Sequence, residues 1–191
     1  MENNILKDRL KEHIYIAQKI LQDEKISAQI IEISKKIIQT YKKGGKIIFI
    51  GNGGSAADAQ HMAAEFVGKY LKDRKALAAV ALTTNTSILT AISNDYSYSD
   101  VFLRQVQALA TKDDIIIGIS TSGNSENVIK ALSYAKENGI FSIGFSGEKK
   151  AKIDQVVDIC VKVPSSSTPR IQEMHEFLLH TIAEIVEQEL F

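Results

Sequence analysis

Two ionisable side chains, His61 and Glu65, stand four residues apart in an alanine-rich stretch. Alanine favours helix, and residues four apart on a helix share one face. An imidazole beside a carboxylate can move protons as an acid–base pair, or the two groups can bind a metal ion. A solvent-exposed ion pair without function has the same spacing, so the neighbouring residues must separate these alternatives.

Two polar, glycine-containing segments each follow a short apolar run. Residues 51–54 (GNGG) follow IIFI, and residues 120–125 (STSGNS) follow IIIGI. Such apolar runs predict buried strands, and the residues after each polar segment predict a helix. We expect Ser55 to cap the first of these helices. A strand, a glycine-rich turn and a helix start together direct backbone N–H groups at an anion.

Neither polar segment matches a nucleotide-binding motif. The second lacks the GKT or GKS ending of a P-loop, and the first lacks the GxGxxG spacing of a dinucleotide-binding fold. Hydroxyl groups at a helix start suit a phosphate monoester. An ordinary strand-to-helix turn is the alternative for either segment alone, but two such turns at one sheet edge favour a ligand site.

The alternation of strands and helices predicts how these motifs come together. It is typical of an α/β, doubly wound three-layer sandwich with a five-stranded parallel sheet, which we expect over residues 44–191. Carboxyl ends of parallel strands meet at one edge, so both polar segments belong there. Strands are expected at 47–50, 76–82, 114–119, 140–145 and 156–163. Helices are expected after the first strand and at 87–93, 99–110, 126–138 and 170–189, with a short turn or helix at 148–154.

Residues 1–43 precede the first strand and carry two helical apolar patterns. This N-terminal helical arm packs either on its own domain or on another subunit. Its length favours another subunit for part of it.

Composition excludes several classes of protein. Lys and Arg number 23 and Asp and Glu also number 23, so no excess charge favours nucleic acid or an anionic membrane. No apolar run approaches the ~20 residues of a membrane span, and the N-terminus lacks the apolar core of a secretory signal. The single cysteine, Cys160, lies in an apolar run and is expected to be a buried thiol. We therefore expect a cytoplasmic protein.

The polar segments and their surroundings resemble a known family. GNGGSAADAQH and ISTSGNSENV are similar to the signature loops of the sugar isomerase (SIS) domain, a flavodoxin-like fold that binds phosphosugars. His61-x-x-x-Glu65, the SND of residues 93–95 and the run at 170–180 further resemble the sedoheptulose 7-phosphate isomerase (phosphoheptose isomerase) family. Its members are homotetramers with one SIS domain per subunit, and the length of the arm fits them.

The resemblance implies an aldose–ketose isomerase that converts sedoheptulose 7-phosphate to D-glycero-D-manno-heptose 7-phosphate through an enediol. This is the first step towards nucleotide-activated heptose for lipopolysaccharide or capsule. By resemblance Glu65 moves the carbon-bound proton and His180 serves the two oxygens, although His180 also fits a core histidine. The implied substrate-binding residues are Asn52, Gly53, Gly54, Ser55, Glu65, Asn94, Asp95, Ser120, Thr121, Ser122, Ser125 and Gln172. One Zn²⁺ per subunit is implied, with His61, Glu65, Gln172 and His180 as ligands.

Three features of the implied site raise chemical questions. Zinc lowers the basicity of Glu65, so this carboxylate cannot be a full ligand and a strong base at once. Gln172 and His180 are about 12 Å apart along an ideal helix, so one ion reaches both only from between them, or if the helix starts after Gln172. Pro169 replaces an Asp that could assist ring opening in some relatives, which leaves that step to His180, another group or the spontaneous reaction.

Two other functions share much of this pattern. A non-catalytic SIS tetramer that binds a replication-initiator protein has the same fold, but a scaffold has no reason to keep the full set of zinc ligands. A phosphosugar-sensing regulator is weakened because no DNA-binding helix-turn-helix or basic segment is attached. The other two histidines, His13 and His175, are expected at the surface or an interface.

Overall fold

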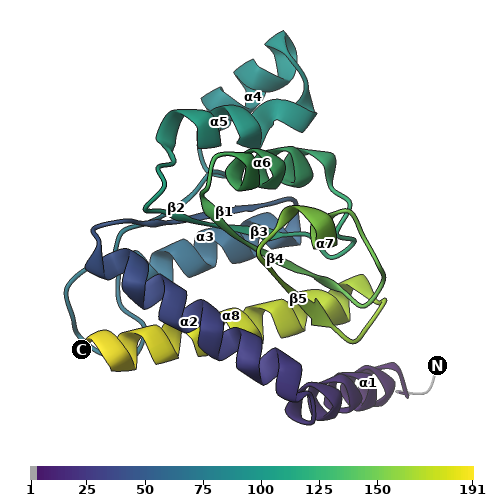
Figure 1. The fold of residues 1–191 in the computed structure, drawn as a ribbon. Coiled ribbons are helices and arrows are strands. Elements are labelled where there is room, and N and C mark those ends of the chain that lie inside the picture. Colours follow the sequence, from purple (N-terminus) through teal and green to yellow (C-terminus); the bar gives the residue numbers. More distant parts are fainter. Residues whose placement is uncertain (1–3) are drawn as a thin grey trace.

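The computed structural model describes residues 4–191, which are built around one five-stranded sheet (Figure 1). All neighbouring strands pair in parallel in the order β2-β1-β3-β4-β5, so the predicted doubly wound α/β fold is confirmed. The strand order reverses between β1 and β3, where such folds bind ligands. The strands are β1 (Ile47–Gly51), β2 (Ala79–Ala81), β3 (Ile115–Ile119), β4 (Phe141–Gly147) and β5 (Ile159–Val163).

Helices cover both faces of the sheet, and each layer has its own apolar core (Figure 1). One layer holds α1 (Asn4–Leu21), α2 (Glu24–Lys42), α3 (Gly54–Val67) and α8 (Thr168–Leu190). The other holds α4 (Thr86–Asp95), the 3₁₀ turn η1 (Tyr98–Asp100), α5 (Val101–Leu109), α6 (Glu126–Glu137) and α7 (Ile153–Val156).

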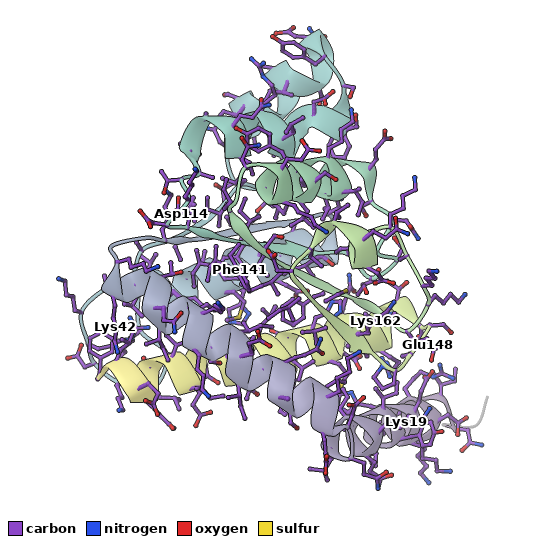
Figure 2. All side chains as sticks on the ribbon, in the orientation of Figure 1. Lys19, Lys42, Asp114, Phe141, Glu148 and Lys162 are labelled. Atoms are coloured by element: carbon purple, nitrogen blue, oxygen red, sulfur yellow. The ribbon has the colours of Figure 1, made fainter. Side chains whose placement is uncertain are left out.

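The central strands explain this layering. Every residue of β1 is buried, and successive side chains of a strand point to opposite faces. Ile47 and Phe49 therefore join the core under α2, α3 and α8, whereas Ile48 and Ile50 join the core under α5 and α6. Side chains fill the space between the sheet and both layers (Figure 2).

One buried carboxylate ties the amino ends of β1 and β3 together. Asp114 accepts hydrogen bonds from the backbone N–H of Lys46 (2.9 Å) and from its ammonium (2.7 Å), and from the backbone N–H of Thr111 (2.7 Å). Burial alone would raise the pKa of Asp114, but these bonds hold it below its usual value. The polar segments lie at the other ends of these strands.

The structure corrects several predicted boundaries. β2 spans only three residues, and β5 begins at Ile159 because residues 153–156 form helix α7 instead. Helix α8 begins at Thr168, so the alternative that it starts after Gln172 is wrong. Pro169 lies in its first turn, where a missing N–H leaves no hydrogen bond unmade.

The two arm helices behave differently, and residues 1–3 of the predicted arm lie outside the described residues. Asp23 caps α2 by accepting from the N–H groups of Lys25 and Ile26, and six residues of α2 are buried within the domain. In α1 only Ile16 and Ile20 are buried. Within residues 4–191, no helix is both long enough and apolar enough to span a bilayer.

Candidate functional site

The turn after β1 leaves the start of α3 without a side-chain cap. Gly53 occupies the N-cap position with φ +57°, a conformation that favours glycine, and no side chain hydrogen-bonds there. The prediction that Ser55 caps this helix is wrong, because Ser55 lies inside the first turn and is buried. The uncapped helix start can receive an oxygen of a ligand.

The turn after β3 forms a compact group of hydroxyls at the start of α6. The Ser120 hydroxyl lies 2.9 Å from that of Ser125 and 3.5 Å from that of Ser122, and Ser122 accepts from the N–H of Asn124 at 3.2 Å. Ser125 is the N-cap residue, but its side chain makes no capping hydrogen bond. The hydroxyls and the helix start together offer several donors to a phosphate.

Side chains join the two turns, as their predicted position at one sheet edge requires. β1 and β3 are paired, with Gly51 opposite Ile119. The Asn52 and Asn127 amides exchange hydrogen bonds of 2.8 and 2.9 Å, and the Tyr98 hydroxyl donates to Asn52 Oδ1 at 2.9 Å. Asn127 and Tyr98 were not among the predicted site residues.

A polar cavity of about 260 Å³ opens beside the second turn. It is bounded by that turn, by the segment after β4 and by the segment before α8. Hydroxyls, backbone groups and two lysines outweigh the one carboxylate in its lining, that of Glu148, which suits a small anionic group. The lining includes Thr121, Ser122, Asn124, Gly147, Glu148, Lys149, Lys150, Ser165, Ser166, Thr168 and Ile171.

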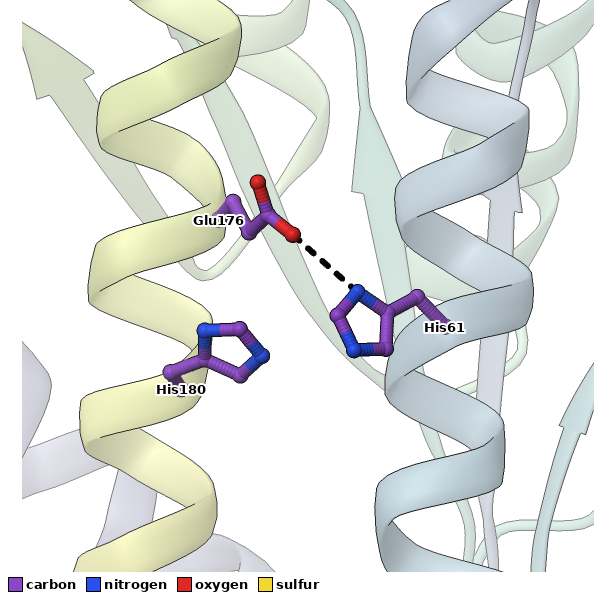
Figure 3. Close-up of side chains that lie close together, drawn as sticks. All are labelled: His61, Glu176 and His180. Atoms are coloured by element: carbon purple, nitrogen blue, oxygen red, sulfur yellow. Dashed lines mark hydrogen bonds and ion pairs between the residues drawn. The ribbon is translucent and has the colours of Figure 1, made fainter.

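Between α3 and α8, His61 and His180 lie close to Glu176 (Figure 3), and Glu65 is a second carboxylate beside His61. His61 Nε2 lies 3.0 Å from Glu65 Oε1, and His61 Nδ1 lies 3.1 Å from Glu176 Oε1. The ring of His180 lies edge-on to that of His61, with centroids 4.9 Å apart. Glu176 was not predicted, although it stands four residues from both Gln172 and His180 on one helix face.

His61 lies between Glu65 and His180, and Tyr70 packs on the ring of His180. The Tyr70 ring stacks on His180 with a centroid distance of 5.5 Å. Burial, and then the charges of Glu184, Glu65 and Glu187, raise the pKa of Tyr70. The carboxylate and the imidazole that the sequence analysis paired therefore lie on the same side of the subunit.

Gln172 lies against the turn between β1 and α3. A Cβ added to Gly54 would come within 2.4 Å of Gln172 Nε2, so glycine makes room for this amide. Gln172 thus joins the β1 turn to helix α8, which also carries His180 one turn beyond Glu176.

Asn94 and Asp95 lie elsewhere. Both are in the last turn of α4, where the Asn94 amide donates to Asp95 Oδ1 at 2.9 Å. Asp95 borders a separate hollow between α4 and α5. Their predicted role in sugar binding stays a prediction.

The donor set fits a divalent metal. One ligand atom each from His61, Glu176 and His180 lie within 4.8 Å of one another, and two imidazoles with a carboxylate form a known zinc set. Asp58, on the same helix as His61, has a buried Oδ2 without a hydrogen-bond partner. Burial, and to a smaller extent the charge of Glu176, raises the pKa of Asp58 to about 6, and the charge of His61 opposes this.

Three further predictions concern the burial of His13, His175 and Cys160. His175 is fully buried and contacts the backbone oxygen of Ser146, so its prediction as a surface or interface residue is wrong. His13 is partly exposed and pairs with Glu173 at 2.8 Å. Cys160 is only partly buried, and burial is the main cause that raises the pKa of its thiol to about 11.

Comparison with known proteins agrees with this architecture. The family model described as "SIS domain" matches residues 14–147. The chain belongs to the SIS domain family. Within this family, phosphoheptose isomerase 2 of Campylobacter jejuni is 51% identical over 189 residues, which cover 99% of this chain and 94% of that protein. The phosphoheptose isomerase of Clostridium acetobutylicum is 51% identical over 188 residues, covering 98% and 96%.

Solved SIS-domain structures share the whole fold. Phosphoheptose isomerase from Neisseria gonorrhoeae superposes with a TM-score of 0.89 at 40% identity, covering 96% of this chain and 97% of that one. Phosphoheptose isomerase from Francisella tularensis gives a TM-score of 0.93 at 29% identity, covering 98% and 100%. The Francisella tularensis structure covers 98% of this chain, so the shared fold extends into the two arm helices.

Proposed function

We propose that this chain is an aldose–ketose isomerase that converts sedoheptulose 7-phosphate to D-glycero-D-manno-heptose 7-phosphate. The observation that carries the proposal is the cluster of His61, Glu65 and His180 beside two turns suited to a phosphosugar. Relatives about half identical over nearly the whole chain bear the name phosphoheptose isomerase, which favours an enzyme over a replication-initiator scaffold. The product is the precursor of nucleotide-activated heptose for lipopolysaccharide or capsule.

The turn between β3 and α6 is the proposed phosphate site. Ser120, Thr121, Ser122 and Ser125 supply hydroxyls, and the start of α6 adds backbone N–H groups and its dipole. The turn after β1, with Asn52 and the backbone of Gly53 and Gly54, is the proposed contact with the sugar. Ser55, Asn94 and Asp95 complete the predicted set of substrate-binding residues, although Ser55 is buried and the other two lie on α4. The 2.8 and 2.9 Å bonds between Asn52 and Asn127 fix the amide that the sugar meets.

The reaction moves one proton between C1 and C2 and exchanges the carbonyl and hydroxyl between these carbons. Glu65 takes the proton from one carbon and returns it to the other, with the enediol between the two steps. His180 gives and takes the protons of the two oxygens, because an imidazole can serve both as a general acid and as a general base. Tyr70, stacked on His180, holds that ring in orientation.

We also propose a Zn²⁺ ion in each subunit, near His61, Glu65, Gln172 and His180. The two imidazoles, the surrounding carboxylates and the unpartnered Asp58 oxygen support this. When bound, the ion polarises the substrate's oxygens as a Lewis acid.

A homotetramer in the cytoplasm completes the proposal. The apolar outer side of α1 and an apolar groove of about 580 Å³ between α1, α2 and α8 support self-association. A cytoplasmic location follows from the substrate, because a charged phosphosugar does not cross a bilayer unaided.

The proposal is tested by incubating purified protein and Zn²⁺ with sedoheptulose 7-phosphate in D₂O and following the sugar by NMR. We expect an aldose phosphate to form and deuterium to enter at C1 or C2. Glu65→Gln and His180→Gln should each abolish turnover while leaving the circular dichroism spectrum unchanged. Neither product nor exchange from the metal-supplied protein would refute an isomerase, and full activity of either variant would refute that residue's role.

A further inference from the structure

We propose that Tyr98 and Asn127 are positioning residues that hold the Asn52 side chain as a hydrogen-bond donor towards the substrate. The inference rests on the proposed function and deepens it, because it names the side chains that orient this amide and the kind of atom that the amide binds. The three side chains form one hydrogen-bonded group at the carboxyl ends of β1 and β3. Tyr98 and Asn127 act through Asn52 and not on the sugar itself.

The backbone of α6 selects the orientation of both amides. Two amides that exchange hydrogen bonds, as Asn52 and Asn127 do, have two possible arrangements, because both can turn over together. Asn127 Oδ1 also accepts from the backbone N–H of Val128 at 3.0 Å. A backbone N–H only donates, so the atom that faces it must be the amide oxygen. Asn127 Nδ2 therefore donates to Asn52 Oδ1, and Asn52 Nδ2 donates to Asn127 Oδ1.

This group uses both acceptor positions of Asn52 and one of its two donors. An amide oxygen has two lone pairs, and those of Asn52 Oδ1 are taken by Asn127 Nδ2 and by the Tyr98 hydroxyl. One N–H of Asn52 Nδ2 is given to Asn127, and within residues 4–191 the other has no partner. Asn127 is 3% exposed, whereas Asn52 is partly exposed. A ligand atom that meets the Asn52 amide must therefore be an acceptor, such as a hydroxyl, carbonyl or phosphate oxygen.

The short turn that carries Tyr98 is tied to α6. Lys130 donates to the Ser99 hydroxyl at 2.6 Å and to Asp100 Oδ1 at 3.0 Å. Lys130 follows Asn127 by three residues on α6, so the two side chains share one face of the helix. The Tyr98 residue is 59% exposed, so its hydroxyl can be removed without opening the core.

A double-mutant cycle tests whether Tyr98 acts through Asn52. Steady-state kinetics with sedoheptulose 7-phosphate are measured for wild type, Tyr98→Phe, Asn52→Ala and the double variant, all supplied with Zn²⁺. Tyr98→Phe should raise KM by about 3- to 10-fold, the effect of one hydrogen bond, and leave kcat within about twofold. In the Asn52→Ala background the same change should alter kcat/KM by less than about twofold, because the amide that Tyr98 orients is absent.

Tyr96→Phe is the matched control for the loss of a tyrosine hydroxyl. Tyr96 is 60% exposed, and its ring lies under the guanidinium of Arg104. This variant should keep the wild-type KM and kcat.

Asn127→Asp tests the polarity of the amide pair. The new side chain keeps an oxygen for the N–H of Val128 but places a second oxygen against Asn52 Oδ1, where Asn127 has a donor. We expect kcat/KM to fall by at least about 10-fold in the wild-type background and by clearly less in the Asn52→Ala background. The added charge is present in both backgrounds, so its own effect cancels in the comparison.

Three results would overturn the inference. The first is a Tyr98→Phe variant with the wild-type KM. The second is an effect of Tyr98→Phe that is equally large without the Asn52 side chain, which would mean that Tyr98 contacts the sugar directly. The third is an equal effect of Asn127→Asp in both backgrounds.

Failure of the proposed function gives a different result. If the wild-type protein does not isomerise the sugar, the same cycle is read in dissociation constants by titration calorimetry. Coupling between Tyr98 and Asn52 in binding without turnover would refute the isomerase and support the inference. A protein that does not bind sedoheptulose 7-phosphate at all would refute both.

Discussion

The imidazole of His175 is fully buried on α8, where Nε2 contacts the Ser146 backbone oxygen at 3.2 Å and Nδ1 has no partner. Burial lowers its pKa to about 4. The unfolded chain binds the proton from about pH 6.5 downward and the folded chain only near pH 4, so stability falls as the pH drops through this window. The full effect is about 3 kcal/mol.

His175→Gln should therefore make the protein less sensitive to acid. Urea unfolding at about pH 7 and about pH 4.5 gives the loss of unfolding free energy for each protein, and we expect the variant's loss to be smaller by up to about 3 kcal/mol. His13→Gln, at a partly exposed histidine, serves as the control and should retain the wild-type loss. Equal losses for His175→Gln and wild type would contradict this origin of acid sensitivity.

Gly54 tests the position of Gln172. An added Cβ would meet the Gln172 amide at 2.4 Å, and this is the mobile end of a side chain, so the amide moves rather than the backbone. Gly54→Ala should keep the unfolding free energy within about 1 kcal/mol of wild type, because alanine also favours the helix. Activity should fall to the level of Gln172→Ala, measured by conversion of sedoheptulose 7-phosphate. A fully active Gly54→Ala variant would show that the position of the Gln172 amide does not affect activity.

At the scale of elements, a buried ion pair fixes the end of α3 against α8. Glu187 accepts from Arg74 Nε and from the N–H groups of Tyr70, Leu71 and Lys72, at 2.8–3.1 Å. Arg74 also donates to the backbone oxygen of Glu65 at 2.8 Å. Together, Glu187 and Arg74 therefore bind the backbone before Tyr70, at Glu65, and the backbone from Tyr70 onward.

Glu187→Gln should destabilise the fold by about 3–5 kcal/mol, because it leaves the Arg74 charge buried without a partner. Chemical unfolding in urea measures the change. The matched control is Glu12→Gln, which breaks the more exposed pair of Arg9 with Glu12 and should cost less than about 1 kcal/mol. Similar costs for both variants would show that burial of the Glu187 pair does not set its contribution.

Sequence patterns predicted the elements better than their junctions. The apolar runs of β1 and β3 located the central strands and the two turns, because buried strands and glycine turns are local signals. The cap at Gly53, the start of β5 at Ile159 and the burial of His175 depend on packing between distant segments. Glu176 had a local signal, its spacing of four from Gln172 and His180, but only the approach of α3 to α8 reveals that it faces His61.

At the scale of the whole molecule, the apolar side of α1 is open to solvent. Ile14 is 54% exposed and lines the groove that α1 shares with Phe177 of α8, itself 57% exposed. Contiguous apolar surface of this kind is typical of a contact between proteins. Ile14→Lys places a charge in the groove and should convert the proposed tetramer to smaller species, because an unpaired buried charge opposes association.

Size-exclusion chromatography with light scattering gives the mass of each species. Lys11→Ala, a substitution at an exposed polar neighbour on α1, is the control and should keep the wild-type mass. Circular dichroism should be unchanged for both variants, since Ile14 is not part of the buried core. An Ile14→Lys protein with the wild-type mass would show that this face of α1 does not join subunits. A wild-type protein that is already monomeric would refute the tetramer itself.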